Sequence, residues 1–179
     1  MGYVNNNNQD LRNQKTLGID QSFSHTGLVV IAKEGSIIEA RGIATKPRDK
    51  DGDHSLEERI GYILNEITYL IRKYQIRQVS IEGLSYSGPR SASVRQLAGL
   101  YYVILHELHN SNIRYQITPP LTLKKESTGS GKASKQDMLD NVPECDVKKL
   151  SELSKLKSES KKFEDIVDAY FLARLASTD

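Results

Sequence analysis

The sequence has 179 residues, of which 37% are hydrophobic and 27% charged, so its length and composition fit one compact domain. Its net charge of +2 excludes binding of nucleic acid through overall positive charge, and any such binding must depend on where the charges lie. A single cysteine, Cys145, excludes an intrachain disulfide and a Cys-rich zinc site, which favours a reducing, intracellular setting. No stretch approaches the roughly 20 apolar residues of a membrane helix. The first residues also lack the apolar centre of a signal peptide, so we expect neither membrane insertion nor secretion.

The N-terminal third of the chain predicts an arm followed by a small sheet. Residues 1–15 include four consecutive asparagines and no apolar period, which predicts a flexible arm. Two apolar segments joined by a short polar loop, Thr16–Asp20 and Thr26–Ala32, are typical of strands, and a turn leads into a third, Ile37–Thr45. We therefore expect a three-stranded antiparallel meander.

A long amphipathic helix is predicted next. Ser55 and Glu58 form a capping box, and apolar residues follow at helical spacing until about Tyr74. A short strand, Arg77–Glu82, precedes a second helix with apolar positions from Val94 to Leu108. The apolar surface of that second helix is wider than packing on one sheet requires, so a partner subunit could cover the excess.

The C-terminal part adds one strand and further helices. Strand Ile113–Thr118 ends at two prolines, and the Gly-, Ser- and Lys-rich loop Ser127–Lys135 leads into a weaker helix. Segment 146–162 contains six lysines and fits a solvated helix, a disordered insert or a contact for a DNA backbone. Helix Phe163–Ala176 closes the chain. The order βββαβαβα predicts an α/β domain over residues 16–179, with a mixed five-stranded sheet, the meander plus two parallel strands, flanked by helices.

Four acidic residues stand where such a fold would bring them together. Asp20 and Glu82 each end a predicted strand, and strand ends in α/β sheets open onto the crevice where ligands bind. Asp165 and Asp168 share one face of the last helix. Gathered carboxylates repel one another unless a cation neutralises them, and all-oxygen ligands suit Mg²⁺ or Mn²⁺. Two such ions about 3.5–4 Å apart are suited to hydrolysis of a phosphodiester.

Each carboxylate also has an ordinary interpretation. A single Asp or Glu at a strand end is commonly a loop cap or a surface charge, and an Asp pair at helical spacing is commonly a solvated face. The joint order, a strand Asp, a strand Glu and a helical Asp-x-x-Asp, favours the metal site.

The segments that carry these residues resemble the RuvC family of Holliday-junction resolvases, within the ribonuclease H-like superfamily, from about Thr16 to Ala176. The resemblance rests on five segments in the family's order: LGIDQSFSHTGLVVI (17–31), VSIEGL (79–84), QLAGLYYVILHEL (96–108), TGSGKASKQDM (128–138) and EDIVDAYFLA (164–173). It implies that the four carboxylates bind two Mg²⁺ ions, which Mn²⁺ would replace, and that Lys124 and Lys135 are catalytic lysines near the scissile phosphate. It also implies a homodimer, and we expect the dimer contact on the Val94–Leu108 helix.

The resemblance further implies contacts with DNA. The family stacks an aromatic side chain, placed soon after the strand glutamate, on an unpaired base at the junction centre; Ser85 stands third after Glu82, and Tyr86, our candidate, stands fourth. An ordinary half-buried loop tyrosine is the alternative. The other expected DNA contacts are Arg90, Lys124, Lys125, Lys132 and Lys135. His25 is interpreted as a polar surface residue, and we assign it no role.

Together these features predict a Mg²⁺-dependent, structure-specific DNA endonuclease that resolves Holliday junctions by paired symmetric nicks, that is, a crossover junction endodeoxyribonuclease. One alternative is a nuclease of the same superfamily with a broader choice of flaps, branched DNA or RNA-containing duplexes. Another is a non-catalytic DNA-binding protein, although retention of all four carboxylates beside phosphate counts against it. We expect the protein inside the cell with its DNA, in the host cytoplasm if it is viral.

Overall fold

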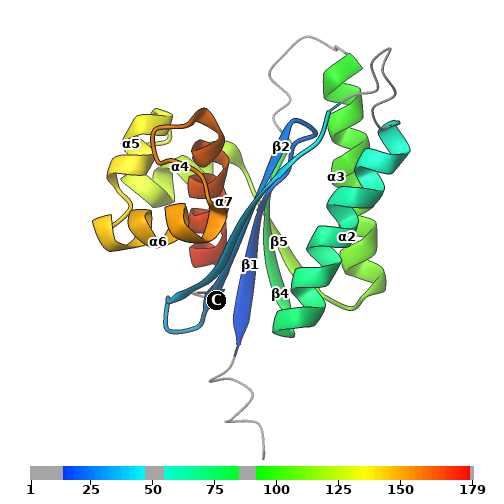
Figure 1. Ribbon diagram of the computed structural model, residues 1–179, viewed down its shortest axis with the longest axis horizontal. Coiled ribbons are helices and arrows are strands. Elements are labelled where there is room, and N and C mark those ends of the chain that lie inside the picture. Colours follow the sequence, from blue (N-terminus) through cyan, green and yellow to red (C-terminus); the bar gives the residue numbers. More distant parts are fainter. Residues whose placement is uncertain (1–13, 47–54, 85–91, 178–179) are drawn as a thin grey trace, which may run out of the picture.

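The computed structural model describes residues 14–46, 55–84 and 92–177. Its five strands form one mixed sheet in the order β3-β2-β1-β4-β5 (Figure 1). The strands are β1 (Lys15–Asp20), β2 (His25–Ala32), β3 (Ile37–Ala44), β4 (Gln78–Glu82) and β5 (Arg114–Thr118). Strands β1, β2 and β3 are the predicted antiparallel meander, and β4 and β5 extend it with parallel pairing. The predicted α/β fold is therefore confirmed, while residues 1–13 of the predicted arm lie outside the described residues.

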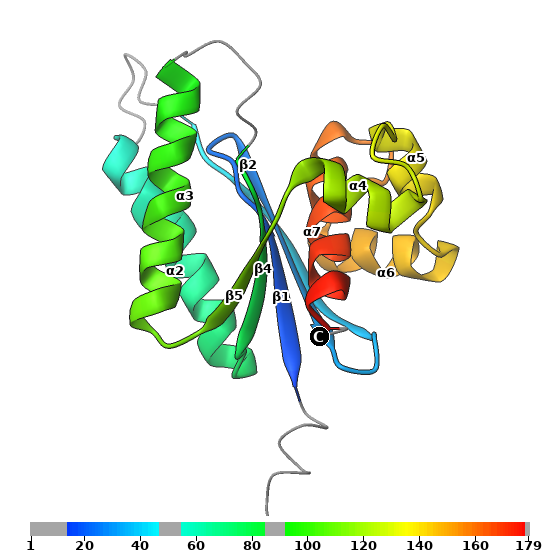
Figure 2. The same cartoon turned by 180° about the vertical axis from the view of Figure 1, so that it is seen from behind.

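Helices cover both faces of the sheet (Figures 1 and 2). One face packs against α2 (Leu56–Tyr74) and α3 (Ala92–Asn110). The opposite face packs against α7 (Lys161–Ser177), with three shorter helices around it: α4 (Pro120–Thr128), α5 (Lys135–Asp140) and α6 (Glu144–Ser154). None of the helices in the described ranges is long and apolar enough to cross a membrane.

Strand β1 sends alternate side chains into the two layers. Leu17 and Ile19 are buried in the core beneath α2 and α3. Thr16 points the other way, and its hydroxyl donates to the carbonyl oxygen of Ala173 in α7 at 3.0 Å. Because side chains alternate along a strand, Asp20 shares the face of Thr16 and looks toward α7.

Helix α7 lies unusually close to the sheet because two glycines leave room for it. A Cβ built at Gly18 of β1 would overlap the carbonyl oxygen of Ala169, and one at Gly27 of β2 would overlap that of Asp165. The backbone of α7 thus rests directly on β1 and β2. This contact places the acidic first turns of α7 beside the end of β1.

The structure adds to the sequence-based predictions in two segments. Strand β5 ends before the two prolines, as predicted, and Pro120 then lies in the first turn of α4, a helix that the sequence analysis did not predict. The N–H that proline lacks would have no helical partner in that turn. Segment 146–162 is not disordered: α6 spans its first half, buries Leu150 in the core under α7 and accepts a hydrogen bond on Asp146 from the hydroxyl of Tyr170 at 2.6 Å.

Candidate active site

The two strand-end carboxylates lie next to each other. Asp20 ends β1 and Glu82 ends β4, and these strands pair in parallel up to Ile19 opposite Ile81. Only 8% of Asp20 is exposed, and Gln21 fixes the strand ends by donating from its side chain to the Glu82 carbonyl at 2.9 Å. The structure therefore brings the two strand-end acids to one edge of the sheet, as predicted.

The pKa of Asp20 is raised by burial and by the neighbouring acids at this edge of the sheet. Burial raises this pKa well above its ordinary value of 3.8, and the charges of Glu82 and Asp165 raise it further, while Lys135 opposes them. Direct interaction with the Asp165 side chain also contributes to the raised pKa of Asp20, so the two side chains are neighbours. Three acids from β1, β4 and α7 thus share one partly dry site.

Glu82 has neighbouring charges of both signs, which shift its pKa in opposite directions. Burial raises its pKa, and Asp165 adds to the increase, whereas Lys135 and Lys124 lower it. Both lysines that the family resemblance singled out therefore lie within electrostatic reach of Glu82. The pKa of Glu82 is nevertheless raised overall, because the effect of burial outweighs that of the two lysines.

Asp168, one turn further along α7, is the most deeply buried acid of the set, with 2% exposure. Its Oδ2 is ion-paired with Nζ of Lys135, which reaches it from the start of α5. Its Oδ1 is buried and has no hydrogen-bond partner among the described residues. A buried carboxylate oxygen without a donor is costly, so this atom calls for a cation or for a donor beyond those that residues 14–46, 55–84 and 92–177 supply.

His25 is placed differently from the sequence-based interpretation. It begins β2, is only 5% exposed, and its Nδ1 lies 2.7 Å from Oδ2 of Asp165. The interpretation as a polar surface residue is therefore wrong. The strand pattern contained a signal, because His25 and Gly27 are two residues apart and therefore share one face of β2. The backbone of α7 packs against Gly27 on that face, so the His25 side chain faces α7 as well.

The donor set fits hard divalent cations. Within the described ranges, no group of three His, Cys, Asp or Glu side chains is arranged as a ready metal site. One oxygen of Asp168 is paired with Lys135, and one oxygen of Asp165 contacts His25. The acids repel one another, and one buried carboxylate oxygen has no partner among the described residues. A bound Mg²⁺ or Mn²⁺ ion would reduce the repulsion and would coordinate such an oxygen. The residues present therefore fit such ions.

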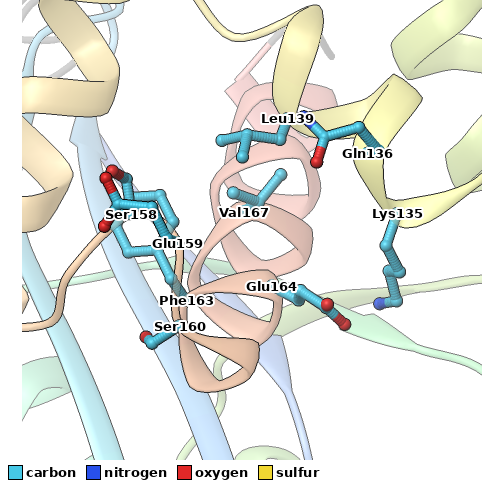
Figure 3. Close-up of a pocket in the computed structure, with 9 residues that line it drawn as sticks. All are labelled: Lys135, Gln136, Leu139, Ser158, Glu159, Ser160, Phe163, Glu164 and Val167. Carbon is cyan, nitrogen blue, oxygen red and sulfur yellow. The ribbon is translucent and has the colours of Figure 1, made fainter.

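A hollow of about 280 Å³ lies between α5, the segment before α7 and the first turns of α7 (Figure 3). Lys135 and Glu164 both line the hollow, and in Figure 3 the Glu164 side chain extends toward that of Lys135. Because Lys135 lines the hollow and is also ion-paired with Asp168, its side chain connects the hollow to the acidic site.

The remaining predicted DNA contacts are only partly described. Lys125 and Lys132 are exposed, on α4 and on the loop after it. Tyr86 and Arg90 lie outside the described residues.

A mixed five-stranded sheet with helices on both faces, and with acids at adjacent strand ends and on the closing helix, defines a ribonuclease H-like fold, the fold of the solved resolvases that this chain resembles. The family model for the crossover junction endodeoxyribonuclease RuvC matches residues 16–173. The chain therefore belongs to the RuvC family, whose members are metal-dependent nucleases and typically homodimers.

Individual relatives agree with this assignment. The crossover junction endodeoxyribonuclease RuvC of Brachyspira hyodysenteriae is 29% identical over 130 residues, which cover 71% of this chain and 78% of that protein. The Thermus thermophilus RuvC structure matches with a TM-score of 0.63 and 20% identity over 89% of this chain and 91% of that one. The same protein in complex with a Holliday junction substrate matches with a TM-score of 0.65 and 17% identity, over 89% and 90% of the two chains. At these identities the structural matches support the fold.

Proposed function

We propose that this protein resolves Holliday junctions by hydrolysing one phosphodiester in each of two opposing strands. The observation that carries the proposal is the meeting of Asp20, Glu82 and Asp165 at one edge of the sheet, in a chain of the RuvC family. Lys135, which interacts with Asp20 and Glu82, links this group to the buried Asp168. The protein would act inside the cell, where its DNA substrate lies.

The four carboxylates would hold two Mg²⁺ ions, with Mn²⁺ as a substitute, and the bound ions would supply Lewis-acid activation of the phosphodiester and a water of lowered pKa. The protein's own contribution is to preorganise the acids. The buried strand end and the close packing of α7 on the sheet keep Asp20 and Asp165 near each other despite their mutual repulsion.

Lys135 is proposed to change partner during the reaction cycle. Without bound cations it neutralises Asp168, the most buried acid of the site. Its side chain is 42% exposed and borders the hollow, so it can also face a phosphate that enters there. A fixed ammonium at that position would stabilise charge that develops on the phosphate oxygens.

DNA is proposed to lie across α4 and the loop that follows it. Lys124, near Glu82, and the exposed Lys125 and Lys132 would bind backbone phosphates. Arg90 is a further proposed DNA contact, and Tyr86 is proposed to stack on a base at the junction centre. Homodimers are typical of the family, and the outer face of α3, where Tyr102 is 58% exposed, is the proposed dimer contact.

A labelled synthetic four-way junction, incubated with Mg²⁺ or with EDTA, tests the proposal. We expect paired symmetric nicks with Mg²⁺ and none with EDTA. Asp20→Asn should abolish cleavage and retain junction binding, because it removes a ligand charge beside the phosphate; Asp140→Asn, a change at an exposed acid on α5, is the matched control. Equal cleavage of linear, three-way and four-way substrates at one salt concentration would replace resolvase by a broader nuclease. Full activity of Asp20→Asn would overturn the site.

A further inference from the structure

We propose that His25 is a positioning residue that sets the orientation of the Asp165 carboxylate toward the metal ions. This inference rests on the proposed function, because Asp165 must be a ligand for its orientation to matter. The contact joins residues 140 positions apart, Nδ1 of His25 and Oδ2 of Asp165, at 2.7 Å.

The imidazole is itself held in a fitted space. His25 is 5% exposed, and its ring lies over the bare backbone of Gly42 in β3. A Cβ at Gly42 would overlap Nε2 and Cε1 of His25 and would lie 3.1 Å from Cδ1 of Leu156. The ring therefore occupies a site that exists only because residue 42 has no side chain.

Two glycines, one beside the Asp165 backbone and one beside the His25 ring, make the placement of Asp165 possible. Gly27 and Gly42 are paired partners across β2 and β3. Gly27 admits the Asp165 backbone, which fixes where the residue sits, and Gly42 admits the His25 ring, which fixes how its carboxylate points. The backbone contact alone leaves the side-chain rotamer of Asp165 open.

A fixed rotamer is needed because Asp165 lies among like charges. Its side chain is 28% exposed, and it meets Asp20 and Glu82 on the inner side. Without a donor, repulsion would favour a rotamer that turns the carboxylate to solvent. The hydrogen bond from His25 opposes that rotation, in the way that hydrogen bonds behind metal ligands generally fix ligand orientation.

The geometry separates this role from catalysis. Nδ1 is engaged by Asp165, and the Nε2 edge of the ring is packed over Gly42. The nitrogen that faces the acids is thus already occupied, and the other lies on the side of Gly42, away from Asp165. His25 therefore acts through Asp165.

Two substitutions of similar size test the contact. In His25→Asn the side-chain amide nitrogen can occupy the position of Nδ1, whereas in His25→Gln it extends toward the position of Nε2. We expect Asn to retain metal binding and Gln to weaken it by roughly 10-fold or more. The readouts are the Mn²⁺ dissociation constant of the DNA-free protein, by electron paramagnetic resonance, and the Mn²⁺ concentration for half-maximal cleavage. The KM for the junction should not change. Equal Mn²⁺ affinity of the two variants, whether both normal or both weak, would overturn the inference.

Gly42→Ala supplies an independent test. In the wild-type background the new methyl group should displace the imidazole and weaken Mn²⁺ binding as His25→Gln does. In the His25→Asn background the clashing atoms Nε2 and Cε1 are gone, so Gly42→Ala should add little. Additive losses in the double variant would contradict the proposal.

Asp165→Asn separates failure of this inference from failure of the proposed function. If Asp165→Asn retains Mn²⁺ binding and cleavage, the proposed site itself is wrong. If it loses both while His25→Gln behaves as wild type, only the positioning role is overturned. Thermal unfolding in EDTA, measured for every variant, identifies any loss that comes from general destabilisation.

Discussion

The carbonyl group of Asp165 lies so close to Gly27 that no side chain fits between the helix and the strand. One end of this contact is a residue of the candidate metal site, and the other is a residue with no chemistry of its own. The candidate site therefore depends on the packing distance of α7 as much as on the acids that α7 carries.

Gly27→Ala is expected to destabilise the protein and abolish cleavage. The added methyl group meets rigid backbone atoms of α7, so relief requires the helix to move away from β2. Overpacking of a core typically costs about 1–3 kcal/mol, measurable by urea denaturation. Gly61→Ala is the control, since nothing lies within 4 Å of its added Cβ and alanine in a helix stabilises by up to about 1 kcal/mol. Normal cleavage by Gly27→Ala would contradict the dependence of the site on this contact.

The sheet and its acids could be predicted from the sequence because each depends on local patterns. Alternating or continuous apolar runs indicate strands, and an acid directly after such a run lies at a strand end. Asp20 and Glu82 needed only this reasoning. Asp165 and Asp168 needed only helical spacing.

What the sequence did not predict depends on contacts distant along the chain. His25 is a single polar residue at the edge of a loop, and its partner lies 140 residues away. The ion pair of Lys135 with Asp168 likewise joins α5 to α7. Helix α4 was missed for another reason: two prolines are typical of a chain break, yet proline is also favoured in the first turn of a helix, as at Pro120.

The stability of the metal-free protein is expected to fall as pH rises. The pKa values of Asp20 and Glu82 are raised in the folded state, so above the ordinary values of 3.8 and 4.5 the folded protein binds more protons than the unfolded chain. The ionised forms of these two carboxyl groups are therefore disfavoured in the folded protein, and the loss of stability grows until the pH passes the raised pKa values. In EDTA, Asp20→Asn should be more stable than wild type at about pH 8, with a smaller gap at about pH 4. Thermal unfolding of both proteins measures this gap. Mg²⁺ should narrow it, and a wild type that is more stable than the variant at the higher pH would refute the repulsion.

Lys135→Gln is expected to lower kcat by roughly 100-fold, the typical loss when one stabilising donor is removed from a reaction centre. The amide has no charge to offer a phosphate or Asp168. Lys132→Gln, at an exposed neighbour, should instead weaken junction binding and reduce its dependence on salt, with kcat retained. Single-turnover cleavage and binding titrations at two salt concentrations distinguish the two effects. If both variants change only binding, Lys135 is a backbone contact and nothing more.

Introducing charge on the outer face of α3 tests the dimer contact. Tyr102 is 58% exposed and Val103 is 37% exposed, and a glutamate at either position would oppose an apolar interface. Tyr102→Glu should shift sedimentation from dimer to monomer and replace paired nicks by isolated ones, since each active site then acts alone. Tyr62→Glu is the matched control, because Tyr62 is a similarly exposed tyrosine on α2, at 51%. The opposite pattern would assign the interface to α2 in place of α3. In that pattern Tyr102→Glu still sediments as a dimer and makes paired nicks, whereas Tyr62→Glu is a monomer.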